Sequence, residues 1–232
     1  MGLRTHGGEM SLQHHGQAGT ITQLVVQPKP PHRVAVFLDD AFAFEVSQSL
    51  VLEWGLRVGG GLSAAEQKGI MAAEQAVLAT EHVLPYITYR RRTAHEIRQK
   101  LRRSGCTEEV VEQAVQLLHA RGILNDAAYA YTYCKARLDL RGDGPNRIRH
   151  ILCQRGIRRE LVDEALQHSL TAEAVLAMAR AQAAKRWPRL SNALDTVQRR
   201  KKLADFLRRR GFPYDTVQQV LHELEQGAAG EE

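Results

Sequence analysis

Residues 93–115 read T-A-H-E-I-R-Q-K-L-R-R-S-G-C-T-E-E-V-V-E-Q-A-V, and this stretch is the most informative about the fold. Thr93 and Glu96 have the spacing of a capping box, in which two side chains satisfy free N–H groups at a helix start. Gly105 can adopt the left-handed backbone conformation that ends a helix. Thr107 can then cap a second helix, so the stretch predicts two helices joined by a glycine turn.

This pattern occurs three times along the chain. Counting from Ile97, Ile148 or Leu203, apolar residues recur at offsets +4, +13, +14 and +18, and glycine recurs at +8. Thr216 is the one polar exception. Offset +9 holds Cys106 in the first copy and a large apolar residue in the others, so we expect Cys106 to be a small core residue. The recurrence predicts a tandem helical repeat.

A third helix fits between successive copies, because capping residues stand there as well, at Asn125-Asp126 and at Thr171. The predicted fold is mainly α, with elongated tandem three-helix repeats in three copies and a small N-terminal antiparallel β element. The last copy is truncated after its second helix. The expected parts are a disordered tail (1–18), the β element (19–62), a connecting helix (63–92), the repeats (93–142, 143–190 and 191–226) and a tail (227–232).

The N-terminal region has a sequence pattern typical of short β-strands rather than of helices. Three β-rich segments over 20–26, 33–38 and 41–46 predict a small antiparallel sheet, and Asp39-Asp40 predicts a tight turn between the second and third. Ser47 is expected to cap a short helix that ends near Trp54.

The segment that follows is predicted to turn and then to enter a long helix. The three glycines at 59–61 lack the Gly-Lys-Ser/Thr of a P-loop and are interpreted as a flexible turn. Ser63 and Glu66 form a second capping box, and Pro85 is expected to kink or interrupt the helix.

The net charge of +6 is unevenly distributed. Residues 90–160 contain 16 Lys and Arg against 8 Asp and Glu, a net charge of +8, so the rest of the chain carries −2. A local basic surface indicates an anionic partner, either nucleic acid or a protein assembly built on it. A solvated, arginine-rich helical surface is the alternative explanation.

Several function classes lack their signatures. The sequence has no G-x-S-x-G, H-E-x-x-H or P-loop motif, so we expect no enzyme and no cofactor. Cys106, Cys134 and Cys153 lack the spacing of a zinc site or a disulfide framework, and Cys153 is expected to be an exposed thiol. No apolar run reaches the length of a membrane span, and no signal-peptide pattern is present, so a cytoplasmic protein is expected.

The chain resembles the RecX family of RecA regulators. The motifs that carry the resemblance are N-D-x-x-Y-A at 125–130, G-P-x-R-I at 144–148 and L-x-x-x-G-I at 152–157, with weaker similarity over about residues 20–225. The resemblance implies an elongated protein of tandem three-helix repeats that binds the groove of the RecA–DNA filament, and we expect the protein to be a monomer. It also implies inhibition of RecA ATPase, strand exchange and coprotease activity, and a role in DNA repair, recombination and the SOS response.

The repeated arginines are the candidate partner-binding residues. If the units stack end to end, the basic positions on the first helix of each copy would form one stripe or groove. Weak, salt-sensitive contact with single- or double-stranded DNA is expected as a secondary property, and a direct DNA-binding protein with Arg-rich helices is the alternative function. The candidate residues are Arg98, Arg102, Arg103, Arg137, Arg147, Arg149, Arg155, Arg208 and Arg209.

Overall fold

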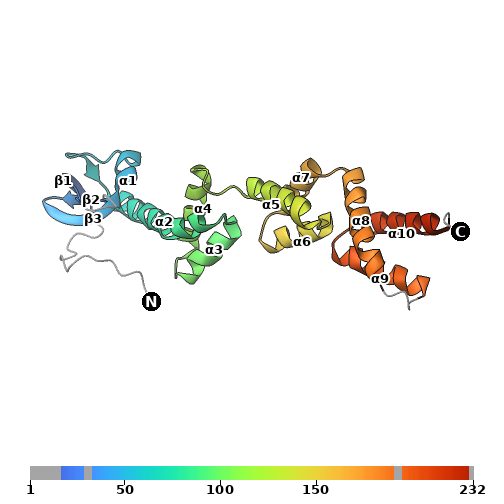
Figure 1. Cartoon of the computed structure of the whole chain (residues 1–232). Helices are drawn as coiled ribbons and strands as arrows, with labels where there is room; N and C mark the ends of the chain where they lie inside the picture. The colour runs from blue at the N-terminus through green and yellow to red at the C-terminus, as the bar shows by residue number, and fades with distance from the viewer. Residues whose placement is uncertain (1–16, 29–32, 191–194, 230–232) are drawn as a thin grey trace. The chain divides into compact units, whose positions relative to one another are not determined.

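The computed structural model describes residues 17–28, 33–190 and 195–229, coloured along the chain in Figure 1. Most of the expected N-terminal tail lies outside these residues. The chain forms two compact units: one comprises Met1–Arg91 and Ile97–Leu124, and the other Arg92–Glu96 and Asn125–Glu232. None of the helices in the described part of the chain is long and apolar enough to cross a membrane.

The first unit begins with an antiparallel sheet in the order β3-β2-β1-β4. Its strands are β1 (Gly19–Val26), β2 (Arg33–Leu38), β3 (Ala41–Ser47) and β4 (Gly61–Leu62). The expected hairpin between β2 and β3 is confirmed, and Asp39 and Asp40 in its turn have positive φ angles of 48° and 65°. Such angles suit the tight two-residue turns of hairpins.

The glycine segment at 59–61 differs from the expected flexible turn. Gly59 N–H donates to the carbonyl of Ile21, and Ile21 N–H donates to the carbonyl of Gly60, each at 2.8 Å. These bonds and the short strand β4 tie the segment to the edge of β1.

Two helices follow the sheet in sequence, α1 (Gln48–Glu53) and α2 (Ala64–Tyr89). Ser63 and Glu66 form the predicted capping box of α2. Ser47 stands at the N-cap of α1 but makes no side-chain capping bond, because its N–H and hydroxyl both donate to the Glu74 carboxylate, at 2.7 and 3.0 Å. Pro85 does not interrupt α2, which continues to Tyr89.

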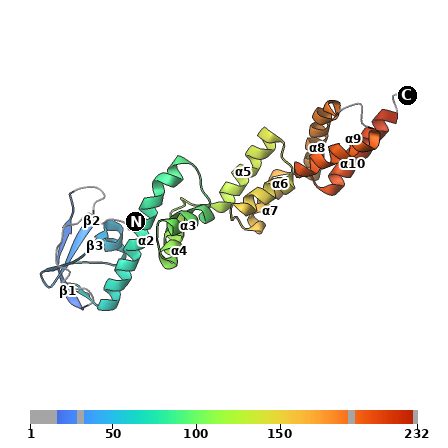
Figure 2. The ribbon, with the colours of Figure 1, turned by 90° about the horizontal axis from the view of Figure 1, so that it is seen from below.

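The opening stretch forms α3 (Ala94–Arg103) and α4 (Glu108–Ala120), as predicted. Thr93 Oγ1 accepts from Glu96 N–H while Thr93 N–H donates to the Glu96 carboxylate, which is the expected capping box. Thr107 caps α4. In the first unit α4 packs against α2, as Figure 2 also shows.

In its described residues the second unit contains six further helices. They are α5 (Asp126–Arg141), α6 (Pro145–Gln154), α7 (Arg159–Ser169), α8 (Ala172–Arg186), α9 (Thr196–Arg209) and α10 (Tyr214–Ala229), with a short 3-10 turn, η1 (Trp187–Arg189), after α8. One core joins α5, α6 and α7 through residues such as Ala130, Ile148 and Val162. A second core joins α8, α9 and α10 through Ala179, Leu203 and Val217.

These cores place each intervening helix with the helix pair that follows it, whereas we expected it to pack with the pair that precedes it. Each three-helix module consists of a helix pair and the helix that precedes it, so α5 packs with α6 and α7. The third module, α8–α10, is complete rather than truncated. The reason lies in the faces of the intervening helices, because Ala130 and Cys134 of α5 are fully buried against the helix pair that follows.

Backbone contacts join the two modules of the second unit at the start of α6. Gly144 N–H donates to the carbonyl of Arg210 at 2.7 Å, and Asn146 N–H donates to that of Gly211 at 3.0 Å. A Cβ at Gly144 would lie 2.5 Å from the Gly211 backbone, so glycine is required there. Free N–H groups at a helix start are thus satisfied by carbonyls at the end of another helix.

Candidate partner-binding surface

The glycine turns that follow helices α3, α6 and α9 have the same geometry in all three copies. Gly105, Gly156 and Gly211 have φ angles of +85°, +76° and +89°. In each copy the N–H after the glycine donates at 3.2 Å to a carbonyl five residues earlier, which is the Schellman arrangement at a helix end. The predicted turns are therefore confirmed, and in the first and third copies basic side chains occupy the last helical turn.

The first arginine of the pattern joins two helices in the first two copies. The Arg98 guanidinium donates to both carboxylate oxygens of Glu112, at 2.7 and 2.9 Å. Arg149 Nε donates to Asp163 at 2.6 Å. These hydrogen bonds hold the pKa values of Glu112 and Asp163 below their ordinary values, so both carboxylates are charged at neutral pH.

Arg102 is also paired within the molecule, on a more exposed surface. Its guanidinium donates to the two carboxylate oxygens of Glu108 at 2.9 and 2.5 Å. The hydrogen bond from Arg102 lowers the pKa of Glu108. Surface pairs of this kind contribute little to stability, but they neutralise charge that a partner would otherwise meet.

Two candidate arginines, Arg137 and Arg147, converge on one buried carboxylate. Asp143 is 5% exposed and lies 3.4 Å from Arg137, 3.5 Å from Arg147 and 3.9 Å from Arg210. Arg137 Nε also donates to the Tyr133 hydroxyl at 2.9 Å. Because buried charges require compensation, Asp143 organises these arginines around itself, at the place where the two modules of the second unit meet.

Arg155 is held by two tyrosines of α5. The rings of Tyr129 and Tyr133 stack with their centroids 6.3 Å apart. The Arg155 guanidinium lies 5.8 and 5.0 Å from the two centroids and donates to the Tyr129 hydroxyl. The tyrosines therefore pack within their module and place Arg155 in a cation–π arrangement.

The remaining candidates, Arg103, Arg208 and Arg209, are exposed. Within the described residues none of their guanidinium groups has an ion-pair partner, although the Arg209 backbone carbonyl accepts from Arg147 at 3.2 Å. The structure thus divides the nine predicted residues into six that are held internally and three whose charge faces solvent.

Sequence reasoning missed the acidic partners of these arginines. An acidic residue stands at offset +15 in the first two copies, as Glu112 and Asp163, whereas the third copy has Ala204 at +1 and Gln218 at +15. The third copy thus lacks both the arginine and its acidic partner, and this joint absence is the sequence signal that the two positions pair. Asp126 was also misread as a cap of its own helix, because its carboxylate accepts from Ala94 N–H at 3.0 Å.

The cysteines occupy three different environments. Cys153 is exposed, as predicted, and Cys134 is buried, which raises its thiol pKa to about 11. Cys106 is half-buried rather than part of the core interior, and burial raises its pKa. Among the described residues no group of three His, Cys, Asp or Glu side chains is arranged to hold a metal ion.

Comparison with known proteins identifies the same family along the chain. The model of the regulatory protein RecX N-terminal domain matches residues 19–63. Models of the first, second and third RecX three-helix domains match residues 79–118, 125–166 and 173–221. These matches place the helix that precedes each helix pair in the same domain as the pair, in agreement with the observed cores.

Individual relatives cover most of the chain. Regulatory protein RecX of Clostridium botulinum (strain Alaska E43) is 29% identical over 204 residues, which are 88% of this chain and 95% of the relative. That of Clostridium acetobutylicum is 27% identical over 210 residues, covering 90% and 97%. A crystal structure of regulatory protein RecX is 28% identical, with a TM-score of 0.72, and the match covers 87% of this chain and 98% of that one. The chain therefore belongs to the RecX family of regulatory proteins.

Proposed function

We propose that this protein binds RecA filaments on DNA and lowers the ATPase, strand-exchange and coprotease activities of RecA. It acts without catalysing a reaction, as a monomer in the cytoplasm, and thereby modulates DNA repair and recombination. The observation that carries the proposal is the series of four RecX domain matches, over residues 19–63, 79–118, 125–166 and 173–221.

The exposed arginines supply the charge that this docking needs. Arg208 and Arg209 end α9 and face solvent without an ion-pair partner among the described residues, and Arg103 ends α3 in the same way. A guanidinium in this state can pair with a carboxylate or phosphate of the filament at no loss of an internal bond. Such complementarity mainly accelerates encounter and fixes the orientation of the complex.

The six internally held candidates have a different part in the proposal. Arg98 and Arg149 would meet a partner only as ion pairs with Glu112 and Asp163. The contribution of Arg98 to the binding surface is therefore positional, because it holds α3, which ends in the exposed Arg103, against α4. Two mechanisms would produce inhibition: bridging of neighbouring RecA subunits, which would restrict nucleotide-linked movement, and obstruction of filament growth.

The test is the ATPase rate of RecA on single-stranded DNA with this protein at a stoichiometric amount. We expect the rate to fall, and an unchanged rate would contradict the proposal. Adding the protein before or after filament assembly separates the two mechanisms. Obstruction of growth lowers the ATPase rate only if the protein is present while filaments assemble, whereas bridging also lowers it on assembled filaments.

Binding to bare DNA tests the alternative function. We expect weak binding to single- and double-stranded DNA that declines steeply with salt, since phosphate contacts release counterions. Tight binding without RecA that persists at high salt would favour a direct DNA-binding protein.

A further inference from the structure

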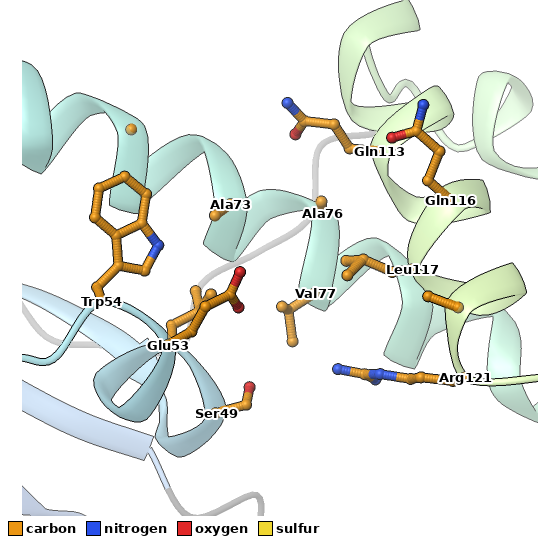
Figure 3. Close-up of a pocket in the computed structure, with 13 residues that line it drawn as sticks. Ser49, Glu53, Trp54, Ala73, Ala76, Val77, Gln113, Gln116, Leu117 and Arg121 are labelled. Carbon is orange, nitrogen blue, oxygen red and sulfur yellow. The ribbon is translucent and has the colours of Figure 1, made fainter.

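The first unit contains a groove that the arginine pattern does not involve. Helices α1, α2 and α4 enclose a volume of about 380 Å³ that opens to solvent (Figure 3). Its wall is apolar along α2 and α4, where Ala73, Ala76, Val77 and Leu117 line it. Figure 3 shows Trp54 at one end and Arg121 at the other.

Trp54 forms a preformed aromatic wall of this groove. Trp54 is the residue directly after α1, and it is 40% exposed. A Cβ built on Gly69 of α2 would lie 2.9 Å from Cη2 of the indole, so glycine lets the ring approach the helix closely. An exposed tryptophan fixed in this way is typical of the anchor positions that dominate protein interfaces.

The polar groups of the groove lack partners within the described residues. The side-chain Oε1 of Gln113 is buried and accepts no hydrogen bond there. An unsatisfied buried acceptor costs about 1–3 kcal/mol, which an N–H donor from an occupant would recover. Glu53 and Arg121 are both exposed, and in the same part of the chain neither makes an ion pair.

We infer that this groove receives a short segment of the filament protein. The segment places one large apolar side chain between Trp54 and Leu117 and donates an N–H to Gln113. An acidic side chain of the segment pairs with Arg121 and a basic one with Glu53. The inference rests on the proposed function, which supplies the partner. DNA is a poor occupant, because the apolar wall offers phosphates nothing and Glu53 repels them.

The experiment measures cosedimentation of the full chain with filaments of RecA on single-stranded DNA. We expect Trp54→Ala to weaken binding at least about tenfold, since a buried aromatic anchor is lost. Arg121→Glu should weaken it about fivefold, with a smaller effect at high salt. Arg121 is an exposed residue at the end of α4, so this second variant tests the groove even if Trp54→Ala disturbs folding.

Matched controls lie on the same helices but outside the groove. Leu52→Ala removes an 83% exposed side chain of α1, and Lys68→Glu makes the same charge change as Arg121→Glu on the exposed surface of α2. Both should bind filaments within about twofold of the wild type, as expected for changes outside an interface. Circular dichroism and thermal unfolding of every variant establish that the fold is intact.

The outcomes separate the groove from the function. If the wild type binds filaments and both groove variants bind equally well, the groove inference is wrong and the proposed function stands. Equal losses of binding to bare DNA would overturn it in favour of a DNA site. If the wild type does not bind filaments, the proposed function fails, and the assignment of the occupant fails with it.

Discussion

Arg102 of α3 and Arg208 of α9 occupy the same position in the repeat but differ in their partners. In the first copy Arg98 and Arg102 are engaged by Glu112 and Glu108 on α4. In the third copy Arg208 and Arg209 extend from α9 into solvent, and α10 offers Gln218 at the position equivalent to Glu112. The same local sequence pattern therefore serves internal cohesion in one helix pair and leaves charge exposed in the other.

Charge counted along the sequence therefore differs from the charge that a partner would meet. In the segment with the largest basic excess, residues 90–160, six of the seven candidate arginines contact a carboxylate or a tyrosine among the described residues of the same chain, and Arg103 is the exception. The third copy lies outside that segment, and its Arg208 and Arg209 side chains are exposed.

The largest effect is expected where arginines surround the buried Asp143. Asp143→Ala leaves Arg137, Arg147 and Arg210 close together without their shared counter-charge. We expect the free energy of unfolding to fall by about 2–3 kcal/mol, less than for a fully buried pair because the arginines are partly exposed. Urea unfolding measures it, with Asp163→Ala as a control that should lose about 1 kcal/mol or less. Equal losses would mean that Asp143 is not a structural centre.

The next effect concerns the exposed arginines. Arg208→Glu with Arg209→Glu should weaken binding to RecA filaments about tenfold or more, because two attractive contacts become repulsive. The free energy of unfolding should change by less than about 0.5 kcal/mol, as is usual for exposed positions. Cosedimentation and urea unfolding on the same preparations measure both quantities. A large loss of stability would show that these side chains have internal partners after all.

A smaller effect is expected for the internally paired arginine of the first copy. Arg98→Glu places two carboxylates together and should lower the free energy of unfolding by about 1 kcal/mol. Combining it with Glu112→Arg should restore most of this loss, because the pair is re-formed with its charges exchanged. A double-mutant cycle by urea unfolding tests this expectation. Absence of any restoration would argue that the pair is incidental.

The smallest effect is the pH dependence of these pairs. The pKa values of Glu112 and Asp163 are lowered by their arginines in the folded state. The stability that they contribute is therefore present above the ordinary carboxyl pKa of about 4 and is lost as pH falls through the lower folded value. The difference in unfolding free energy between the wild type and Glu112→Gln should shrink at acid pH. A difference that is constant from pH 7 to pH 2.5 would contradict it.

Much of the fold could be predicted because its signals are local. Capping by Thr93 and Thr107, the three glycine turns and the buried positions of the repeat follow from short-range backbone and side-chain chemistry. The grouping of helices could not be predicted in this way. The spacing of apolar residues alone does not tell whether an intervening helix packs on the helix pair before it or after it. The burial of Ala130 and Cys134 against α6 and α7 decides this for α5.

The candidate surface was less predictable, because it depends on contacts between distant residues. Ser47 has the sequence of a cap, yet Glu74, which is 27 residues away, binds both of its donors. In the same way Asp126 satisfies Ala94 rather than its own helix. Tertiary structure decides which donors each carboxylate binds, and it also decides which arginines remain exposed.

The most direct test of the comparison is the filament affinity of two double variants measured side by side. One is Arg208→Glu with Arg209→Glu, and the other is Arg98→Glu with Glu112→Arg, which keeps the internal pair and changes no net charge. We expect the first to lose about tenfold or more in affinity for RecA filaments and the second to stay within about twofold of the wild type. Equal losses, or a larger loss for the exchanged pair, would contradict the division into internal and exposed arginines.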